Sequence, residues 1–248
     1  MKKKRKSSGI IIIGNEILSG KTLDTNSNFM CNELFNKGIS CDEVNITRDE
    51  ELRIIEKIDL FKSKYDYVFT SGGIGPTHDD ITSKSVAKAF GQKLVLNKKA
   101  KELLQKHYLD DDLTKARMKM AYLPENAIII DNPISIAPGF KVENVFVFPG
   151  VPKILEIMFK EVINSLSGGK KYFKKTVTTI LSEGLIGDDI EKIQRKHDIV
   201  EIGSYPYFKR NSFGVSLVIS GDNKKKVLDV TSEVYNYIKL KNGNPKIF

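Results

Sequence analysis

The sequence has few cysteines and no long apolar run, and both absences narrow what kind of protein it can be. Its 248 residues include only two cysteines, Cys31 and Cys41. Two thiols are too few for a disulfide framework, and their spacing is not that of a metal site. No apolar stretch approaches the roughly 18 residues that a transmembrane helix needs. The apolar run at residues 10–13, behind a basic start, is too short for a signal peptide. We therefore expect a cytoplasmic protein without a membrane span.

Acidic residues are fewer than basic ones, and the imbalance is confined to the two ends of the chain. The net charge is +9. Residues 2–6 are all basic, residues 7–169 hold 20 basic and 22 acidic residues, and residues 170–248 hold 15 basic and 9 acidic residues. The first two-thirds of the chain are therefore not a basic platform for nucleic acid. No aromatic-basic recognition motif accompanies the positive ends, so nucleic acid is not an expected main partner.

Short apolar strands alternate with amphipathic helices along the first two-thirds of the chain. The predicted strands cover residues 10–13, 44–46, 67–70, 128–130 and 145–148. The predicted helices cover about 25–37, the segment after Glu50, the segment ending at Gly91, 99–122 and 153–166. Polar Asp110-Asp111-Asp112 is expected to separate 99–122 into two helical pieces. In the helix after Glu50, the residues Leu52, Ile55 and Ile58 form the predicted inward stripe. This alternation favours βαβ units and a mostly parallel sheet that is covered on both faces.

Ser167-Gly168-Gly169-Lys170 is the clearest linker, and it divides the chain into two predicted domains, residues 8–167 and 170–248. The predicted elements of the second domain are a strand at 176–181, a helix at 186–197, strands at 199–205 and 213–219, and a helix at 223–240. This β-α-β-β-α order predicts a small α+β domain. It contains no glycine-rich phosphate loop, so we expect the ligand site in the first domain.

The strongest functional signal is the segment 70–82, which follows a predicted buried strand and opens a helix. Glycine lets the backbone approach a ligand closely, and free N–H groups near a helix N-terminus favour anions. The residues expected to hold a phosphate are Ser71, Gly72, Gly73, Gly75, Pro76, Thr77 and Thr82. In an open α/β sheet such loops lie at the carboxyl ends of the strands, where ligands bind. The alternative is a tight strand-to-helix turn that binds nothing.

Asp79 and Asp80 are unusual in a loop that binds anions. Two carboxylates beside a phosphate would repel it unless a cation lay between them. Oxygen ligands that face phosphates are the usual arrangement for Mg²⁺, so we expect a divalent metal at Asp79 and Asp80, most simply Mg²⁺ with Mn²⁺ or Co²⁺ as alternatives. Helix capping is the competing role for Asp80, because Thr77 and Asp80 have the spacing of a capping box. His78 lies in the same polar loop and is expected to be solvated.

Other glycine-containing loops follow predicted strands and border the same edge of the sheet. They are the segments 14–21, 137–139 and 149–152, and a polar run at 24–28 continues the first of them. The residues expected to complete the pocket are Gly14, Glu16, Ser19, Gly20, Asn26, Gly139 and Gly150. Convergence of several loops is what a ligand pocket needs.

Four of these segments, 14–20, 71–82, 137–140 and 149–152, resemble in order and spacing the molybdopterin-binding (MoaB/Mog) domain over about residues 8–166. The subgroup they resemble most is the N-terminal part of competence/damage-inducible protein A (CinA). Residues 170–248 resemble the small domain that follows it there, with Gly203-Ser204-Tyr205-Pro206 as the marker. The resemblance implies a three-layer αβα fold and assembly as a homo-oligomer.

The resemblance also implies an activity. The CinA subgroup is associated with metal-dependent ADP-ribose pyrophosphatase activity, and related domains fused to FAD synthases are associated with FAD hydrolysis. In the molybdenum-cofactor branch, the acids that match Asp49 and Asp80 are essential for activating molybdopterin, which makes both of them candidate catalytic residues here. The loop after Pro152 reads Lys153-Ile154-Leu155 where many relatives have Ser-Glu-Met. The loss of that acid argues against a metal role for this loop.

The leading hypothesis is a metal-dependent hydrolase that acts on the diphosphate of ADP-ribose or of a related dinucleotide such as FAD. One alternative is a module that binds a pterin or nucleotide without turnover, and another is adenylyl transfer to molybdopterin. In each case the partner is a phosphorylated, nucleotide-like or pterin small molecule. CinA proteins often carry a nicotinamide-nucleotide deamidase domain as well. The sequence stops at Phe248, before such a domain would fit, so we expect no deamidase activity.

Overall fold

The computed structural model describes residues 5–108, 112–169, 171–209 and 212–248, and its chain forms two compact units, Met1–Gly169 and Lys170–Phe248. The elements of the first unit are β1 Ser7–Ile13, α1 Asn15–Leu18, α2 Asn26–Lys37, β2 Ser40–Thr47, α3 Glu51–Lys64, β3 Tyr67–Ser71, α4 Thr82–Ala89, β4 Leu94–Leu96, α5 Lys98–His107, α6 Lys115–Met118, the 3-10 helix η2 Lys119–Ala121, β5 Tyr122–Pro124, β6 Ile128–Ile130, β7 Gly139–Val142, β8 Val145–Phe148 and α7 Pro152–Ser165. Those of the second unit are β9 Phe173–Thr179, α8 Glu183–Lys196, β10 Val200–Lys209, β11 Ser212–Gly221, α9 Lys224–Leu240 and β12 Lys246–Ile247.

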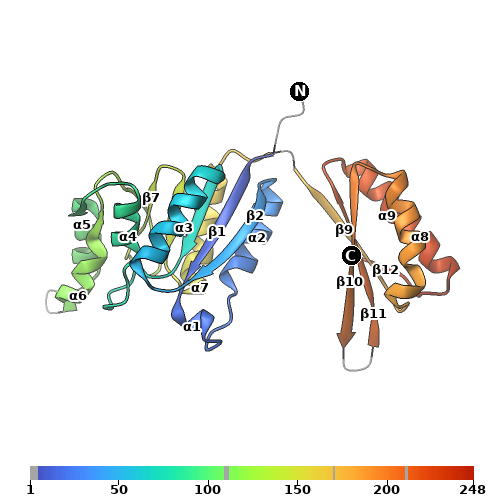
Figure 1. The fold of residues 1–248 in the computed structure, drawn as a ribbon, viewed down its shortest axis with the longest axis horizontal. Helices are drawn as coiled ribbons and strands as arrows, with labels where there is room; N and C mark the ends of the chain where they lie inside the picture. The colour runs from blue at the N-terminus through green and yellow to red at the C-terminus, as the bar shows by residue number, and fades with distance from the viewer. Residues whose placement is uncertain (1–4, 109–111, 170, 210–211) are drawn as a thin grey trace. The chain divides into compact units, whose positions relative to one another are not determined.

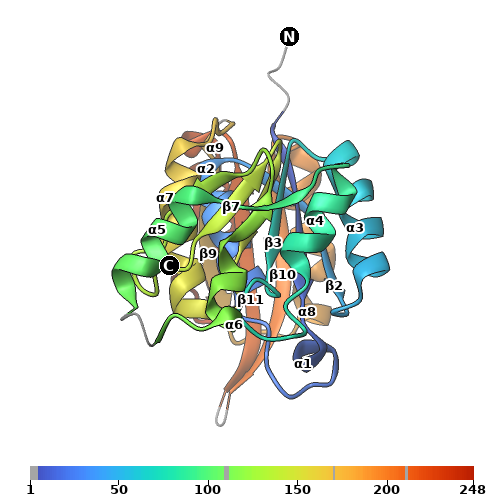
Figure 2. The ribbon, with the colours of Figure 1, turned by 90° about the vertical axis from the view of Figure 1, so that its left-hand side faces the viewer.

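A six-stranded sheet with the order β2-β1-β3-β8-β7-β6 forms the centre of the first unit. The pairs β1–β2, β1–β3 and β3–β8 are parallel, whereas β7 pairs antiparallel with both β8 and β6. Helices α3 and α4 cover one face, and α2 and α7 cover the other (Figures 1 and 2). The predicted three-layer fold with a mostly parallel sheet is therefore confirmed. Its parallel strands place the carboxyl ends of β1, β3 and β8 at one edge.

The side chains of β1 alternate between the two faces of the sheet and contribute to two separate hydrophobic cores. Ile11 and Ile13 are buried against α3 and α4, and Ile10 and Ile12 are buried against α2 and α7. A strand buried on both faces must be apolar at every position, which explains the continuous isoleucine run. Because the two cores hold the central strands in place, the loops that follow these strands begin at fixed positions.

The inward face of α3 differs from the predicted one. Leu52 is 78% exposed, whereas Ile54, Ile58 and Phe61 are fully buried. The buried residues have the i, i+4, i+7 spacing of one helical face, and an aromatic ring two turns on from Ile54 fixes that face toward the sheet. Ile55 is only partly buried beside them.

Several short strands were not anticipated. β7 forms a hairpin with β8, and β4 pairs antiparallel with β5 in a separate two-stranded sheet. The segment predicted as two helical pieces, 99–122, is divided into α5, α6 and η2 and ends in β5. The missed strands β4, β5 and β7 are only three or four residues long and carry too little periodicity to be recognised, so only their partners make them strands. The acidic residues Asp110 and Asp111, predicted to separate two helical pieces, lie outside the described residues.

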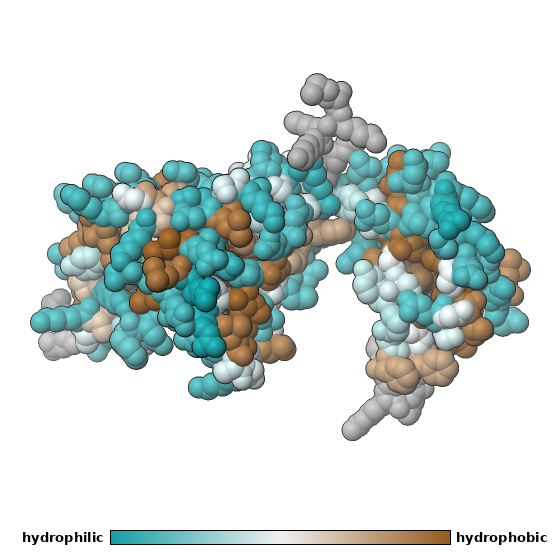
Figure 3. Space-filling view, in the orientation of Figure 1, coloured by the Kyte–Doolittle hydropathy of each residue, from teal (hydrophilic) through white to brown (hydrophobic). Residues whose placement is uncertain are grey.

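The second unit is an antiparallel sheet, order β10-β11-β9-β12, with α8 and α9 packed on it. The β-α-β-β-α order is as predicted, and β12 adds an edge strand beyond it. Ile190 of α8 and Val230 of α9 are buried in its core against Leu217 of β11. No helix among the described residues is long and apolar enough to cross a membrane. On the face drawn in Figure 3, apolar side chains form separate patches among polar ones.

Candidate functional site

Three loops meet at the carboxyl edge of the central strands. The backbone N–H of Gly72, after β3, donates to the carbonyl of Phe148 at the end of β8 (3.0 Å), and that of Gly14, after β1, donates to the carbonyl of Thr47 at the end of β2 (3.1 Å). A Cβ added to Gly150 would lie 3.4 Å from the Cα of Gly72. The loops predicted to share an edge therefore do so, and they touch one another.

The glycine-rich loop requires its glycines for packing as well as for access. Gly72 and Gly73 have positive φ angles of 109° and 70°, which L side chains rarely adopt. A Cβ on Gly72 would lie 2.1 Å from the carbonyl oxygen of Ile13, and one on Gly73 would lie 2.2 Å from Oγ1 of Thr82. The buried Thr82 hydroxyl donates to the carbonyl of Gly72 (2.9 Å). Thr82 thus stabilises the conformation of the loop through the Gly72 carbonyl.

Asp79 and Asp80 share one partner, Thr77. Oδ2 of Asp80 accepts the backbone N–H of Thr77 (2.8 Å) and lies 2.5 Å from its hydroxyl oxygen, and Oδ1 of Asp79 lies 2.5 Å from the same oxygen. Helix α4 begins only at Thr82, with no side-chain cap at Ile81. The contact has the form of a capping box, but it closes the loop rather than capping the helix. The hydroxyl contact also lowers the pKa of Asp79.

Asp49 brings a third carboxylate to the edge from the loop after β2. Its Oδ2 accepts the backbone N–H of Asn15 (2.8 Å). Partial burial raises the pKa of the Asp49 carboxyl, the Asn15 hydrogen bond opposes this, and the charges of Glu16 and Asp79 raise it further. A carboxyl whose pKa is raised by neighbouring carboxylates marks a region of negative potential, which a cation would relieve.

These residues line a cavity of about 390 Å³ that we call the acidic chamber. Its lining is Ile13, Glu16, Asp49, Gly72, Gly73, Ile74, Gly75, Thr77, Asp79, Asp80, Pro149, Gly150 and Val151. A second cavity of about 580 Å³, the outer chamber, shares Glu16, Asp49 and Asp79 with it. The outer chamber adds Ser19, and also Lys21 and Arg48, which sequence reasoning had not selected. Two cations beside the acids could hold an anionic ligand in place.

A narrow groove on the α2 side completes the edge. Asn26, Ser71 and Gly150 line it, together with Glu16, which also faces the acidic chamber. Pro76 lines an adjoining apolar cavity instead. Most of the predicted ligand residues therefore border one connected region.

Four of the predicted residues do not line these cavities, and each has a structural role. Gly14 joins the end of β1 to the end of β2 through its hydrogen bond to Thr47. Gly20 ends α1 in a turn with φ 73°, and Thr82 supports the glycine-rich loop. Gly139 is buried in β7, where a Cβ would lie 2.5 Å from the carbonyl oxygen of Val147 and 2.8 Å from the side chain of Met158. Close packing explains that glycine without a ligand. The side chain of His78 is 97% exposed.

The acids fit a metal that is held together with a ligand better than one held by protein alone. Among the described residues, no three His, Cys, Asp or Glu side chains form a group that could enclose a metal ion. No described residue donates a hydrogen bond to Oδ1 of Asp80. Mg²⁺ commonly binds through one or two carboxylates and the phosphates of its substrate. Asp79 and Asp80 suit this arrangement, because both lie beside the loop that would hold the phosphates.

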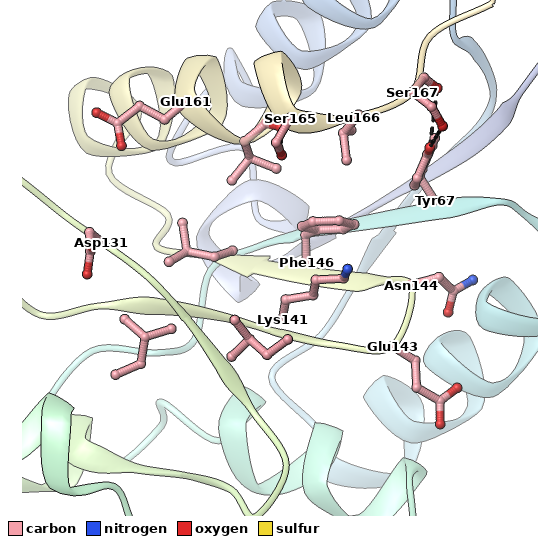
Figure 4. Close-up of a pocket in the computed structure, with 14 residues that line it drawn as sticks. Tyr67, Asp131, Lys141, Glu143, Asn144, Phe146, Glu161, Ser165, Leu166 and Ser167 are labelled. Atoms are coloured by element: carbon pink, nitrogen blue, oxygen red, sulfur yellow. Dashed lines mark hydrogen bonds between the residues drawn. The ribbon is translucent and has the colours of Figure 1, made fainter.

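A separate cavity of about 600 Å³ lies beside β6, β8 and α7 (Figure 4). It is lined by Tyr67, at the start of β3, so it lies away from the loops that follow the strand ends. Asp131, Glu143 and Glu161 lie apart around it, and Lys141 extends over the ring of Phe146 (5.0 Å). Its polar groups do not converge on one point, so it offers no comparable site.

Comparison with known proteins matches both units to known domain families. The model of the probable molybdopterin binding domain matches residues 9–168, and that of the middle domain of FAD synthase matches residues 171–243. A CinA-like protein of Fusobacterium nucleatum is 31% identical over 240 residues, which are 93% of this chain and 58% of that protein. A probable FAD synthase of Caenorhabditis briggsae is 30% identical over 249 residues, which cover 89% of this chain and 47% of that protein. The chain thus spans about half the length of these two relatives.

The crystal structure of a CinA protein of unknown function from Thermoplasma acidophilum covers 64% of this chain and 98% of its own, with 35% identity and a TM-score of 0.60. The resemblance inferred from the four sequence motifs is confirmed by these matches. The matched segment 9–168 contains the whole sheet edge and all three of its glycine loops. The chain is therefore a CinA-like member of the molybdopterin-binding domain family.

Proposed function

We propose that this protein hydrolyses the diphosphate linkage of a dinucleotide such as ADP-ribose or FAD, with a divalent metal ion. The observation that carries the proposal is the acidic chamber, in which Glu16, Asp49, Asp79 and Asp80 face the glycine-rich loop. Backbone N–H groups and short side chains suit phosphates, whereas the carboxylates would repel them. A phosphorylated ligand that binds together with a cation suits both the N–H groups of the loop and the carboxylates of the chamber.

Each side of the chamber has a task in such a reaction. Hydrolysis adds one water across the P–O–P bridge, so each product keeps a phosphate group, and the attacking water gives up a proton. Asp49 is placed to accept that proton, because partial burial and the neighbouring acids raise the pKa of its carboxyl. Asp79 and Asp80 would hold the cation, which when bound polarises the phosphoryl oxygens. Gly72, Gly73 and their neighbours would position the diphosphate.

The relatives support a nucleotide diphosphate as the ligand class. One is named a probable FAD synthase, and the second unit matches the middle domain of that enzyme. FAD contains the same diphosphate bridge as ADP-ribose. We also propose that the chain forms a homo-oligomer, as the family resemblance implies, which light scattering on the purified protein would test.

Two other functions have specific support. The absence of an enclosed group of three metal-ligating side chains among the described residues favours a binding module without turnover. The family description, a probable molybdopterin binding domain, favours a pterin ligand and adenylyl transfer to it. These functions differ from hydrolysis in their products, so one set of assays separates them.

The deciding experiment incubates the purified chain with ADP-ribose, FAD or ATP plus molybdopterin, each with Mg²⁺, Mn²⁺, Co²⁺ or EDTA. Chromatography then measures AMP and pyrophosphate. We expect AMP from ADP-ribose or FAD only when a metal is present. Saturable binding of both dinucleotides without AMP release would refute hydrolysis and support the binding module. Pyrophosphate release from ATP that requires molybdopterin would support adenylyl transfer instead.

A further inference from the structure

An apolar cavity of about 320 Å³ adjoins the acidic chamber. The two cavities share Ile74, Gly75, Pro149 and Val151. We call this cavity the apolar chamber; its other lining residues include Tyr108, Arg117, Met120, Asn132, Ala137 and Ile154. They come from α6, η2, α7 and the segments after α5 and β6, so nothing in the local sequence groups them. A ligand held by the glycine-rich loop could extend directly into this space.

One wall of the apolar chamber is a stacked pair. The guanidinium carbon of Arg117 lies 4.3 Å from the centre of the Tyr108 ring. Nη1 of Arg117 donates to the carbonyl of Asp112 (2.6 Å), and its backbone N–H donates to the Thr114 side chain, which caps α6 (3.2 Å). These contacts fix the guanidinium over the ring. Planar guanidinium and aromatic groups are the surfaces on which nucleotide bases stack.

The loop between β6 and β7 forms another part of the lining. Asn132, which is 4% exposed, donates to Oγ of Ser135 and to the carbonyl of Ala137 (both 2.8 Å) and accepts the N–H of Ile134 (3.0 Å). Ile136 has a φ of 65°, which is rare for a β-branched residue. Backbone in such a conformation persists only where surrounding contacts hold it, and it occurs often at ligand sites. The loop therefore presents Ala137 to the chamber in a fixed position.

We propose that the apolar chamber binds the planar heteroaromatic ring of a nucleotide whose phosphates lie in the acidic chamber. This inference rests on the proposed function of that site and adds where the base is held. The lining is mainly apolar, the Arg117–Tyr108 pair offers a flat cationic surface, and the volume lies at the lower end of small-molecule sites. The small side chain of Ala137 leaves the space that a ring would occupy.

Calorimetry with two probes separates the ring from the phosphates. ADP carries both, and pyrophosphate carries only the phosphates; each is titrated into the full chain with Mg²⁺. The substitution Ala137→Trp fills the chamber, and Ile134→Trp is the matched control, because Ile134 belongs to the same loop but is 46% exposed and does not line the chamber. We expect Ala137→Trp to weaken ADP about tenfold or more, the scale of a stacked base, and to leave pyrophosphate unchanged. Ile134→Trp should change neither.

A second variant guards against misfolding of the first. Arg117→Met keeps the length of the side chain but removes the guanidinium plane, so it should weaken ADP and spare pyrophosphate in the same way. Unchanged ADP affinity in both variants would overturn the proposal. If the wild-type chain binds neither probe, the phosphate site itself fails, and adenosine then decides about the chamber. Adenosine binding that Ala137→Trp abolishes would support the ring site, and no adenosine binding by the wild type would overturn it.

Discussion

The side-chain amide of Asn26 donates to the hydroxyl of Ser71 across 2.9 Å and so joins the start of α2 to the end of β3. The same Nδ2 donates to the carbonyl of Gly150 (2.8 Å), which lies in the loop after β8. Asn26 is 7% exposed, and its Oδ1 is buried without a partner among the described residues. One side chain therefore connects two of the ligand loops and leaves an acceptor at the edge of the pocket.

Replacing Asn26 should loosen this edge. Asn26→Ala removes one buried and one partly buried hydrogen bond and leaves their acceptors unsatisfied, so we expect the free energy of unfolding to fall by ~1–3 kcal/mol. Nucleotide affinity should fall with it, because the loops at Ser71 and Gly150 lose their common support. Urea unfolding and calorimetry measure the two effects. Asn36→Ala, at an exposed position of the same helix, is the control and should change neither.

Replacement by alanine should change the free energy of unfolding in opposite directions at two glycines. Gly72→Ala places a Cβ 2.1 Å from the carbonyl oxygen of Ile13 at a positive φ, so we expect at least ~1–3 kcal/mol of destabilisation. Gly187→Ala lies inside α8 with open space around its Cβ, and the higher helix propensity of alanine should stabilise by roughly 1 kcal/mol. Denaturant unfolding of both variants gives the comparison. An equal tolerance of alanine at both positions would contradict the tight fit of the loop.

Asp80→Asn separates the structural role of this residue from its chemical one. The amide oxygen of asparagine can still accept the N–H of Thr77, and Asn caps about as well as Asp, so the melting temperature should stay nearly unchanged. Turnover should fall roughly 10²-fold or more, because the charge and basicity are lost. Nucleotide affinity without metal should rise as repulsion eases. Asp131→Asn, an exposed acid outside the site, is the control.

Unchanged turnover in Asp80→Asn with an unchanged melting curve would end the catalytic assignment of Asp80. The chemistry would then move to Asp49, or the binding module would become the better description. The comparison requires turnover, melting and metal-free affinity on one preparation.

Asp49 should make stability depend on pH in an unusual direction. Folding raises its pKa above 3.8, so the folded state binds the proton more tightly than the unfolded state does. Its contribution is fully present below the unfolded pKa and is lost as the pH rises through the folded pKa. Asp49→Asn should therefore gain melting temperature relative to the wild type as the pH rises from 3.5 to 7.5.

The pKa of Asp79, in the same chamber, is shifted in the opposite direction, so its contribution to stability depends on pH in the opposite way. The Thr77 hydroxyl lowers its pKa, so its contribution is present above the unfolded pKa and is lost as the pH falls through the folded one. Asp79→Asn should thus lose melting temperature relative to the wild type as the pH rises. Parallel trends for the two variants in thermal scans would disprove the assigned surroundings of both acids.

The first unit should bind nucleotide without the second. All the cavities described at the sheet edge are lined by residues before Gly169, and this unit contains two cores of its own. We expect a fragment of residues 1–169 to bind ADP with Mg²⁺ as the full chain does, as measured by calorimetry. Loss of affinity in a fragment with a normal circular dichroism spectrum would mean that the second unit contributes to the pocket.

Local patterns were sufficient to predict much of the first unit. The isoleucine run of β1 predicted a buried strand, and the segment 70–82 predicted a glycine-rich loop. Both signals are contained in a few residues that are consecutive in the sequence. The four-residue strand β7 was missed, and the inward face of α3 was misplaced. The pairing of β7 and the buried face of α3 both depend on the element that each packs against. The periodicity of the local sequence does not specify that neighbouring element.

The sequence by itself determined the family, the alternation of strands and helices, and the loops at which a ligand would bind. These follow from short-range chemistry: glycine at positive φ, apolar residues in buried strands, and acids after a glycine-rich turn. Only the tertiary structure decided that Asn26 joins two loops, and that Arg117 and Tyr108 stack beside the acidic chamber. Those contacts join residues from separate elements, and the packing of helices against the sheet brings them together, which is a property of the whole unit rather than of any segment.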